Sequence, residues 1–166
     1  MTSASDAEVN AFVGLGSNLD NPVQQIRRAL SQLEILPGTS VVAISSLYRS
    51  APFGDVEQSD FVNAVAHLQT RLDAESLLQQ LLGIESAQGR VRGERWGPRI
   101  IDLDLLVHGD TISDSHELKL PHPGIAERNF VLLPLQEIAP ETVLPGLGKV
   151  ADIAVDRNDP QIARLD

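Results

Sequence analysis

The chain has 166 residues, of which 42% are apolar, and these supply one compact core but not two. Its 13 Lys and Arg stand against 23 Asp and Glu, and the resulting formal charge of −10 disfavours a nucleic-acid partner. Because there is no cysteine, a disulfide framework, a thiolate nucleophile and a cysteine-based zinc site are all excluded.

Apolar runs along the chain are much shorter than the roughly 20 residues that a membrane span requires. The first ten residues are polar and acidic, whereas a signal peptide begins with a basic and then an apolar stretch. We therefore expect a cytoplasmic protein without a membrane partner. Residues 1–166 are expected to form a single domain, with a loose N-terminus over about 1–8 and a C-terminal tail over about 141–166.

The first predicted elements are a strand and a helix. Residues 9–13 form a short apolar run that ends in a glycine-containing loop, which is typical of a buried strand. Asn21 is a candidate N-cap, and Pro22 suits the first helical position. Apolar residues at helical spacing then continue until Pro37 and Gly38, where the predicted helix ends.

Two strands and a second helix are expected next. Residues 41–48 are rich in Val and Ile, and residues 61–69 alternate between apolar and polar positions, so both segments predict strands. The aperiodic stretch 49–60 between them is longer than a simple connection needs, as functional loops often are. Asp73 is the expected cap of a helix that ends near Gly89.

The remaining sequence predicts one more core strand. The irregular stretch 90–98 leads into a fourth strand over 99–107, followed by a short polar hairpin, the Pro-His-Pro segment 121–123 and an apolar segment 130–138. Within the tail, residues 149–155 are expected to add an edge strand. The core order of strand, helix, strand, strand, helix, strand predicts the α+β class with a ferredoxin-like (split βαβ) antiparallel sheet and both helices packed on one face.

Asp102 and Asp104 are the sharpest chemical signal. Residues two apart on a strand point to the same side, about 6.6 to 7 Å apart, while the Ile and Leu residues between and beside them fill the other side. A divalent cation compensates the repulsion and burial cost of two such carboxylates, and hard oxygen ligands favour Mg²⁺ or Mn²⁺ with substrate phosphates. A solvated face, or pairing of each Asp with an arginine, is the alternative.

Positive charge is concentrated just before this strand. Arg90, Arg92, Arg95 and Arg99 fall within ten residues, with Gly93, Gly97 and Trp96 between them and Gly89 just before them. Guanidinium groups bind phosphate oxygens in a bidentate manner, and the indole can stack on a heterocycle. A solvated basic turn is the alternative, but arginines leading into an Asp-x-Asp strand favour a metal-nucleotide site.

Other familiar sites are not supported. Gly14 and Gly16 begin like a dinucleotide-binding fingerprint, but Leu19 occupies the third glycine position, and no P-loop motif is present. The four histidines are scattered, which argues against a histidine zinc site. His122 lies between two prolines and suits either a structural turn or phosphate binding.

Five strings resemble those of the family of 6-hydroxymethyl-7,8-dihydropterin pyrophosphokinases of folate biosynthesis. They are V-G-L-G-S-N-L (13–19), S-S-L-Y-R-S-A-P-F-G (45–54), F-V-N-A-V (61–65), G-R-V-R-G-E-R-W-G-P-R-I-I-D-L-D (89–104), and L-P-H-P with E-R-N-F-V-L-x-P-L-x-E-I-A-P (120–140). The resemblance implies a ferredoxin-like fold and transfer of pyrophosphate from MgATP to the pterin hydroxymethyl group, releasing AMP.

Site roles also follow from this resemblance by position. Asp102 and Asp104 match the aspartates that hold two Mg²⁺ ions, and Arg90 and Arg99 match catalytic arginines that act on the transferring group. Positions matching ATP contacts are Glu85, Arg92, Arg95, Trp96, Leu105, His122 and Arg128. Positions matching the pterin pocket are Ser50, Ala51, Phe53, Phe61, Asn63, Trp96 and Phe130.

The sequence departs from the common family pattern at a few positions. Leu82 stands where many members carry Gln, and Lys119 replaces a frequent Thr. The loop between Arg92 and Glu94 is one residue shorter than in some members. None of these differences affects the predicted metal site.

Two other functions compete with this interpretation. A Mg-dependent nucleotidyltransferase would use the same aspartates and arginines but attack the α-phosphorus and release pyrophosphate. A ferredoxin-like RNA-binding module would use aromatic residues on its sheet, which the −10 charge opposes. We expect small-molecule substrates, no nucleic acid and a monomer.

Overall fold

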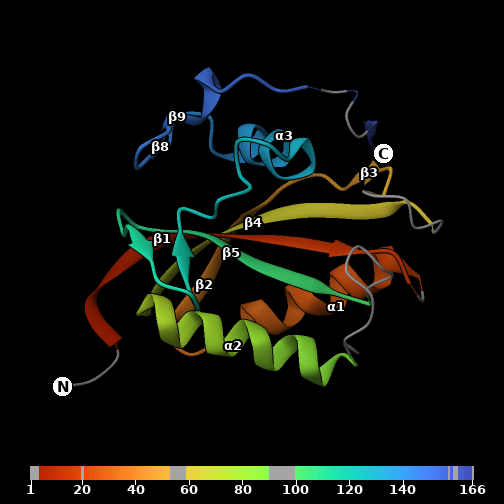
Figure 1. Cartoon of the computed structure of the whole chain (residues 1–166). Coiled ribbons are helices and arrows are strands. Elements are labelled where there is room, and N and C mark those ends of the chain that lie inside the picture. Colours follow the sequence, from red (N-terminus) through yellow and green to blue (C-terminus); the bar gives the residue numbers. More distant parts are fainter. Residues whose placement is uncertain are drawn as a thin grey trace.

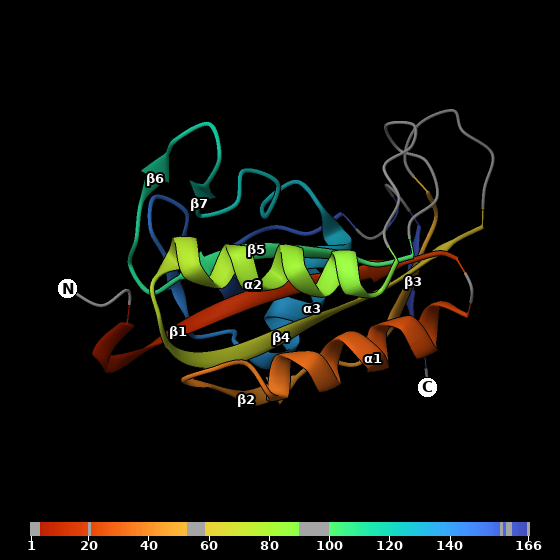
Figure 2. The same cartoon turned by 90° about the horizontal axis from the view of Figure 1, so that it is seen from below.

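The computed structural model describes residues 4–19, 21–52, 59–89, 100–156, 158 and 161–165, with side chains from residue 7 onward. A central antiparallel sheet separates two layers of helices. Two long helices lie side by side on one face of the sheet, and a shorter helix lies on the other (Figures 1 and 2). Because the third helix is short, it covers only part of its face of the sheet (Figure 1).

The helices are α1 (Pro22–Glu34), α2 (Ala74–Ala87) and α3 (Asn129–Ile138), and a short 3-10 turn, η1, covers Val150–Asp152. The strands are β1 (Ala4–Ser17), β2 (Thr39–Ile44), β3 (Tyr48–Ser50), β4 (Phe61–Leu72), β5 (Asp102–His108), β6 (Ser113–Asp114), β7 (Lys119–Leu120), β8 (Val143–Leu144), β9 (Gly148–Lys149) and β10 (Ile162–Arg164).

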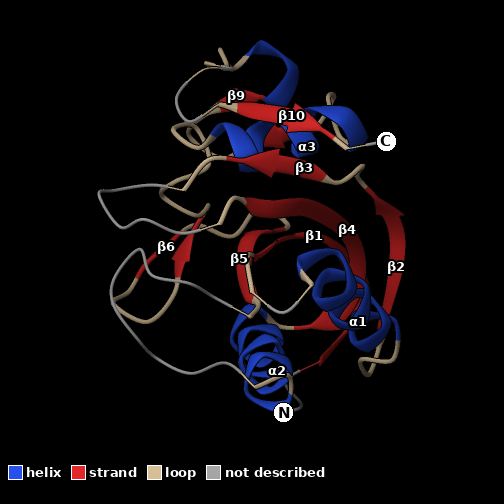
Figure 3. Ribbon diagram, turned by 90° about the vertical axis from the view of Figure 1, so that its right-hand side faces the viewer, coloured by secondary structure: helices blue, strands red, loops and turns tan. Residues whose placement is uncertain are grey.

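The main sheet has the strand order β10-β3-β4-β1-β5, and β2 also pairs with β4. All of these pairings are antiparallel. β1 and β4 are central. β5, which follows α2, flanks them on one side, and β2 and β3, which follow α1, flank them on the other, which is the order of the predicted ferredoxin-like fold. Figure 3 shows β10 next to β3, on the side of the sheet away from β5.

The two long helices begin in different ways. Pro22 occupies the first turn of α1 as predicted, but Asn21 adopts the left-handed conformation (φ 64°), and its side chain makes no capping bond within the described residues. The Asp73 side chain caps α2 by accepting a 2.7 Å hydrogen bond from the Ser76 N–H. The predicted cap is therefore confirmed for α2 and wrong in mechanism for α1.

Each face of the sheet has its own apolar core. The core beneath α1 and α2 includes Ile26, Leu33 and Leu81 together with inward residues of the central strands. The other core joins Phe12 and Leu106 of the sheet to α3 and the segment after it. Burial on both faces explains why the central strands are apolar along much of their length.

Several predicted boundaries differ from the structure. The predicted strand 9–13 is the middle of β1, which begins at residue 4. The predicted strand 41–48 is divided into β2 and β3, which pair with different parts of β4. The edge strand predicted over 149–155 is wrong: η1 occupies part of that segment, and the edge strand lies instead at 162–164.

Candidate active site

One row of residues crosses the sheet on the α3 side. Tyr48 pairs with Asn63, Asn63 pairs with Gly16, and Gly16 pairs with Asp102, so these four residues of β3, β4, β1 and β5 share one face. In the next row, Gly14 of β1 pairs with Asp104. Polar groups therefore gather at the end of this face, beyond the apolar core that α3 covers.

Asp102 and Asp104 lie opposite glycines on the neighbouring strand. Both side chains are partly exposed, whereas Leu103 between them is buried against α2, as their alternation predicts. A side chain at Gly16 would enter the site, since its Cβ would stand 3.2 Å from the Asn63 Oδ1. Gly16 thus leaves the sheet surface beside Asp102 open, whereas Gly14 is buried, and a Cβ there would meet the Leu106 side chain at 3.6 Å.

Asn63 is the best-defined polar group on the neighbouring strand. Its side chain is buried, and its amide donates a 2.7 Å hydrogen bond to the Ser50 Oγ. Ala51, which follows Ser50 in the chain, donates its backbone N–H to the Gln161 carbonyl at 3.0 Å. Phe61, partly exposed, pairs with Ser50 across β3 and β4, so an aromatic ring adjoins this polar edge.

The segment after β7 brings His122 to the outer side of β5. The His122 backbone N–H bonds to the Leu106 carbonyl at 2.8 Å, and the Gly124 N–H donates to the His122 Nδ1 at 3.1 Å. Burial lowers the pKa of His122, with a contribution from Arg128 that is opposed by Asp104. The neutral ring then carries its proton on Nε2, as a donor for an anion.

Arg128 packs across Gly124, where a Cβ would come within 2.7 Å of the guanidinium Nε. The Arg128 backbone N–H also bonds to the Gly124 carbonyl at 3.1 Å. This turn therefore holds a guanidinium group in the neighbourhood of His122 and Asp104. Two donors and a carboxylate in this arrangement suit a phosphate group with a bound cation.

Phe130 lies in the first turn of α3 and is partly buried against the second core. Leu105 has a different setting, because its side chain is 4% exposed in the core beneath α1 and α2. Any contact of Leu105 with a ligand on the other face would have to use its backbone.

Glu85 of α2 also belongs to the helix side of the sheet. Its carboxylate is 3% exposed and accepts the Leu103 backbone N–H at 2.7 Å, between the two aspartates in the sequence. This bond fixes the backbone of β5 at the place where Asp102 and Asp104 project to the other side. Its predicted contact with ATP stays a prediction.

Six predicted site residues lie outside the described residues. They are Phe53, Arg90, Arg92, Arg95, Trp96 and Arg99. The described residues bring together the predicted metal pair, the pterin-side residues Ser50, Ala51, Asn63 and Phe61, and the phosphate-side residues His122 and Arg128 on one side of the sheet. They do not test the roles assigned to those residues.

The donor set suits a cation that is shared with a substrate. Within the described ranges, no group of three or more His, Cys, Asp and Glu side chains could hold a metal ion by itself. Two carboxylates on an open surface match the way Mg²⁺ binds, because that ion takes one or two protein carboxylates and completes its shell with water and substrate phosphates. The residues present therefore fit Mg²⁺ with a polyphosphate.

Comparison with known families decides the identity. The model of the family described as 7,8-dihydro-6-hydroxymethylpterin-pyrophosphokinase (HPPK) matches residues 12–140. The chain belongs to the HPPK family. The expected enzyme class, a pyrophosphokinase of folate biosynthesis that uses ATP, is thereby confirmed.

Curated relatives agree with the HPPK assignment. The chain is 41% identical to 2-amino-4-hydroxy-6-hydroxymethyldihydropteridine pyrophosphokinase of Haemophilus influenzae over 157 residues, covering 95% of this chain and 98% of the relative. It is 50% identical to the protein of the same name from Pseudomonas aeruginosa over 134 residues, covering 81% of this chain and 83% of the relative.

Solved structures share the HPPK fold. Plasmodium falciparum HPPK-DHPS, wild type, matches with a TM-score of 0.72 at 17% identity, over 95% of this chain and 44% of that one. A variant of it with pterin and p-hydroxybenzoate matches with a TM-score of 0.75 at 17% identity. This chain spans about half the length of those chains. The predicted fold class is confirmed.

Sequence reasoning missed some residues that shape this HPPK site. The sequence predicts Gly14 and Gly16 as a loop after the first strand, as the start of a dinucleotide-binding fingerprint and as part of the first family string, but not as neighbours of the aspartates. Both lie within β1, and no role is predicted for Gly124. The sequence signal was present, since glycines in an apolar strand indicate a close approach, but only the register shows which groups approach.

Among the described residues, none of the helices has the length and apolar character for crossing a membrane.

Proposed function

We propose that this HPPK transfers the β,γ-pyrophosphoryl group of MgATP to the hydroxymethyl oxygen of 6-hydroxymethyl-7,8-dihydropterin, with the aspartates and polar edge described above as its active site. One observation carries the proposal: the row from Asn63 through Gly16 to Asp102 puts an amide for a heterocycle and a carboxylate for a metal on one open face. The products are the pterin diphosphate and AMP.

Asp102 and Asp104 are the proposed ligands for two Mg²⁺ ions. The ions, when bound, neutralise phosphate charge and hold the transferring group in line with the acceptor hydroxyl. Glu85 supports this pair by fixing the Leu103 backbone between them. We therefore propose that Glu85 serves ATP binding indirectly, by positioning the strand that carries the two aspartates. The burial of its carboxylate supports this role.

The polyphosphate is proposed to lie beside His122 and Arg128. A neutral His122 donates a hydrogen bond through Nε2, since its Nδ1 accepts the Gly124 N–H. Arg128 supplies a guanidinium fork for phosphate oxygens. Arg90 and Arg99, with Arg92, Arg95 and Trp96, are proposed to complete the ATP side, and they lie outside the described residues.

The pterin is proposed to lie over the other end of the row. Asn63 and the backbone near Ser50 and Ala51 offer donors and acceptors for its hydrogen-bonding edge, while the rings of Phe61 and Phe130 supply apolar contact. In the reaction, the pterin hydroxyl oxygen bonds to the β-phosphorus and loses its proton. The bond from that phosphorus to the oxygen bridging to the α-phosphate breaks, and AMP departs.

A product assay tests this reaction against the nucleotidyltransferase alternative, which the family match does not favour. The protein is incubated with MgATP and the pterin alcohol, and nucleotides are separated by chromatography. Appearance of AMP and a pterin diphosphate supports the proposal, whereas release of free pyrophosphate with a nucleotidylated pterin contradicts it. Titration of the rate with Mg²⁺ tests the number of ions.

The single-domain organisation over 1–166, the cytoplasmic location and the monomeric state remain predictions. Light scattering on a size-exclusion column tests the last of these, and a mass near 18.0 kDa is expected.

A further inference from the structure

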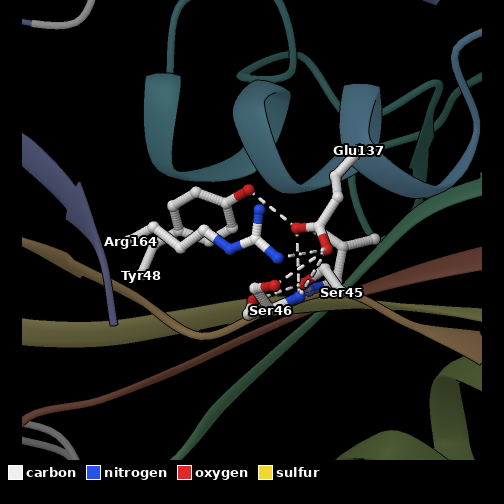
Figure 4. Close-up of polar contacts among 6 residues, drawn as sticks. Ser45, Ser46, Tyr48, Glu137 and Arg164 are labelled. Carbon is white, nitrogen blue, oxygen red and sulfur yellow. Dashed lines mark hydrogen bonds and ion pairs between the residues drawn. The ribbon is translucent and has the colours of Figure 1, made fainter. Parts of the chain in front are cut away.

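Glu137, near the end of α3, binds three donor groups. Each of its carboxylate oxygens lies 3.0 Å from the Ser46 backbone nitrogen, and Oε2 also accepts the Ser46 hydroxyl at 2.9 Å. The Tyr48 hydroxyl donates to Oε1 at 2.7 Å, and Arg164 of β10 lies 3.7 Å away (Figure 4). One side chain thus joins α3, the link between β2 and β3, and the C-terminal strand.

These segments carry the two proposed walls of the pterin site. Phe130 lies seven residues before Glu137 on α3, so the two residues lie two turns apart on the same side of the helix. Tyr48 begins β3, and the same strand ends at Ser50, next to Ala51. The Glu137 contacts therefore set how far the Phe130 ring stands from the polar edge formed by β3 and β4.

A carboxylate suits this position better than its amide. Ser46 and Tyr48 present three donors, and an ionised carboxylate only accepts, so it satisfies all of them. A Gln at the same place would turn one amide N–H₂ toward a donor. Loss of the charge should therefore loosen the junction without removing the side chain's bulk.

The C-terminal strand contributes from the outer side. Its residues pair with β3, and the Ala51 N–H bonds to the Gln161 carbonyl at 3.0 Å. Arg164, in the same strand, faces Glu137. The family match ends at residue 140, so this support comes from a part of the chain beyond it.

We propose that Glu137 is a positioning residue for the pterin pocket, which sets the distance between the Phe130 wall and the Ser50–Ala51 edge and leaves the ATP side unchanged. This proposal rests on the pterin pocket proposed above. It also assigns a role to the C-terminal strand, because β10 pairs with β3 and so supports the Ser50–Ala51 edge from outside.

Binding measurements on the full chain test the proposal. Calorimetry measures the affinity for the pterin alcohol with an unreactive ATP analogue present, and separately the affinity for that analogue, in wild type, Glu137→Gln and Tyr48→Phe. We expect pterin affinity to fall about tenfold in Glu137→Gln and less in Tyr48→Phe, with the nucleotide affinity unchanged. The KM for pterin should rise correspondingly while that for ATP stays constant.

Two variants are matched controls. Asp73→Ala removes another carboxylate that accepts a backbone N–H, but on α2 beneath the opposite face, and should lower stability without changing either affinity. Lys149→Ala removes an exposed ion pair with Glu141 away from the site, and should change neither affinity. Parallel losses of pterin and nucleotide affinity in Glu137→Gln, or no loss at all, would overturn the proposal.

The proposed function has a separate outcome. If wild-type protein releases no AMP and binds no pterin, the proposed function is wrong. An active wild type with an unaffected Glu137→Gln variant contradicts the positioning role alone. If Glu137→Gln does not fold, Tyr48→Phe carries the test, since it removes one hydroxyl, and an unchanged pterin affinity there contradicts the proposal.

Discussion

Gly16 on β1 lies directly opposite Asp102 on β5, so a position without a side chain adjoins a carboxylate of the proposed metal pair. Asn63 lies on the other side of Gly16, at the distance where an added Cβ would already be in tight contact with its Oδ1. The sheet surface between Asp102 on the proposed metal side and Asn63 on the proposed pterin side is therefore open only because residue 16 is a glycine.

Gly16→Ala is expected to lower turnover and weaken pterin binding, because the methyl group displaces the Asn63 amide. Gly83→Ala is the matched control: a Cβ at that exposed position of α2 meets nothing within 4 Å. The control should raise the free energy of unfolding by about 0.5 to 1 kcal/mol and leave activity unchanged. Steady-state kinetics and urea unfolding measure both, and equal activity in the two variants contradicts the role of Gly16.

Asp102→Asn and Asp104→Asn should each remove most turnover and leave the fold intact, since each loses a proposed metal ligand. In metal-free buffer the unfolding temperature should not fall below that of wild type, because half of a repulsive acidic pair is gone. Release of AMP across a Mg²⁺ titration is the measurement. Near-normal activity at limiting Mg²⁺ would show that the assignment is wrong.

Phe130→Ala should weaken pterin binding by about 1 to 3 kcal/mol through lost ring contact, with little change in nucleotide affinity. Calorimetry with an unreactive ATP analogue separates the two. Phe53→Ala, at a position outside the described residues, should behave alike. An equal loss of pterin and nucleotide affinity would show that Phe130 only packs in the core and does not contact the pterin.

Arg90→Ala and Arg99→Ala should lower kcat by on the order of 10²-fold or more, if these groups neutralise charge on the moving pyrophosphoryl group. Ground-state binding of either substrate should change less. Both residues lie outside the described residues, so the test is kinetic. Variants that change only KM would show that the two arginines serve in binding.

Asp73 provides a pH test of the α2 cap. Hydrogen bonds from Ser76 lower its pKa below the usual 3.8, so the ionised form stabilises the fold. The contribution is present above that usual value and is lost as the pH falls through the lower folded-state pKa. Asp73→Ala should cost about 1 kcal/mol near neutral pH, and its difference from wild type should shrink in acid.

Asp73→Asn is the control, because an amide oxygen caps a helix without titrating. Its stability difference from wild type should be smaller than that of Asp73→Ala at neutral pH. Thermal unfolding between neutral and acidic pH measures all three proteins. A loss for Asp73→Ala that is the same at every pH would contradict a cap that depends on charge.

The central fold could be predicted because each of its helices and strands shows a recognisable local sequence pattern. The alternation of β4 and the Asp73 cap of α2 are visible in neighbouring residues, and the order of elements then limits the topology. The division of 41–48 is different, because Ser45 bonds to Val65 and Ser46 bonds to Glu137, which are distant in the sequence. No local pattern specifies those partners.

The apolar segment 130–138 could not be assigned for a similar reason. Pro134 lies inside α3, and an interior proline argues against a helix. Packing of Val131, Leu132 and Leu135 into the second core holds the helix nevertheless. At the site, the spacing of Asp102 and Asp104 predicted a shared face, but their glycine partners depend on strand register.

The outer edge of β5 has a further consequence for how the molecules behave together. An unpaired sheet edge invites a strand from another molecule, and this is a common start of aggregation. Here the Leu103 N–H is taken by Glu85 and the Leu106 carbonyl by the His122 N–H, so the chain itself occupies groups that an incoming strand would need. The same buried carboxylate that steadies the proposed metal-bearing strand therefore also protects the protein against edge-to-edge association at high concentration.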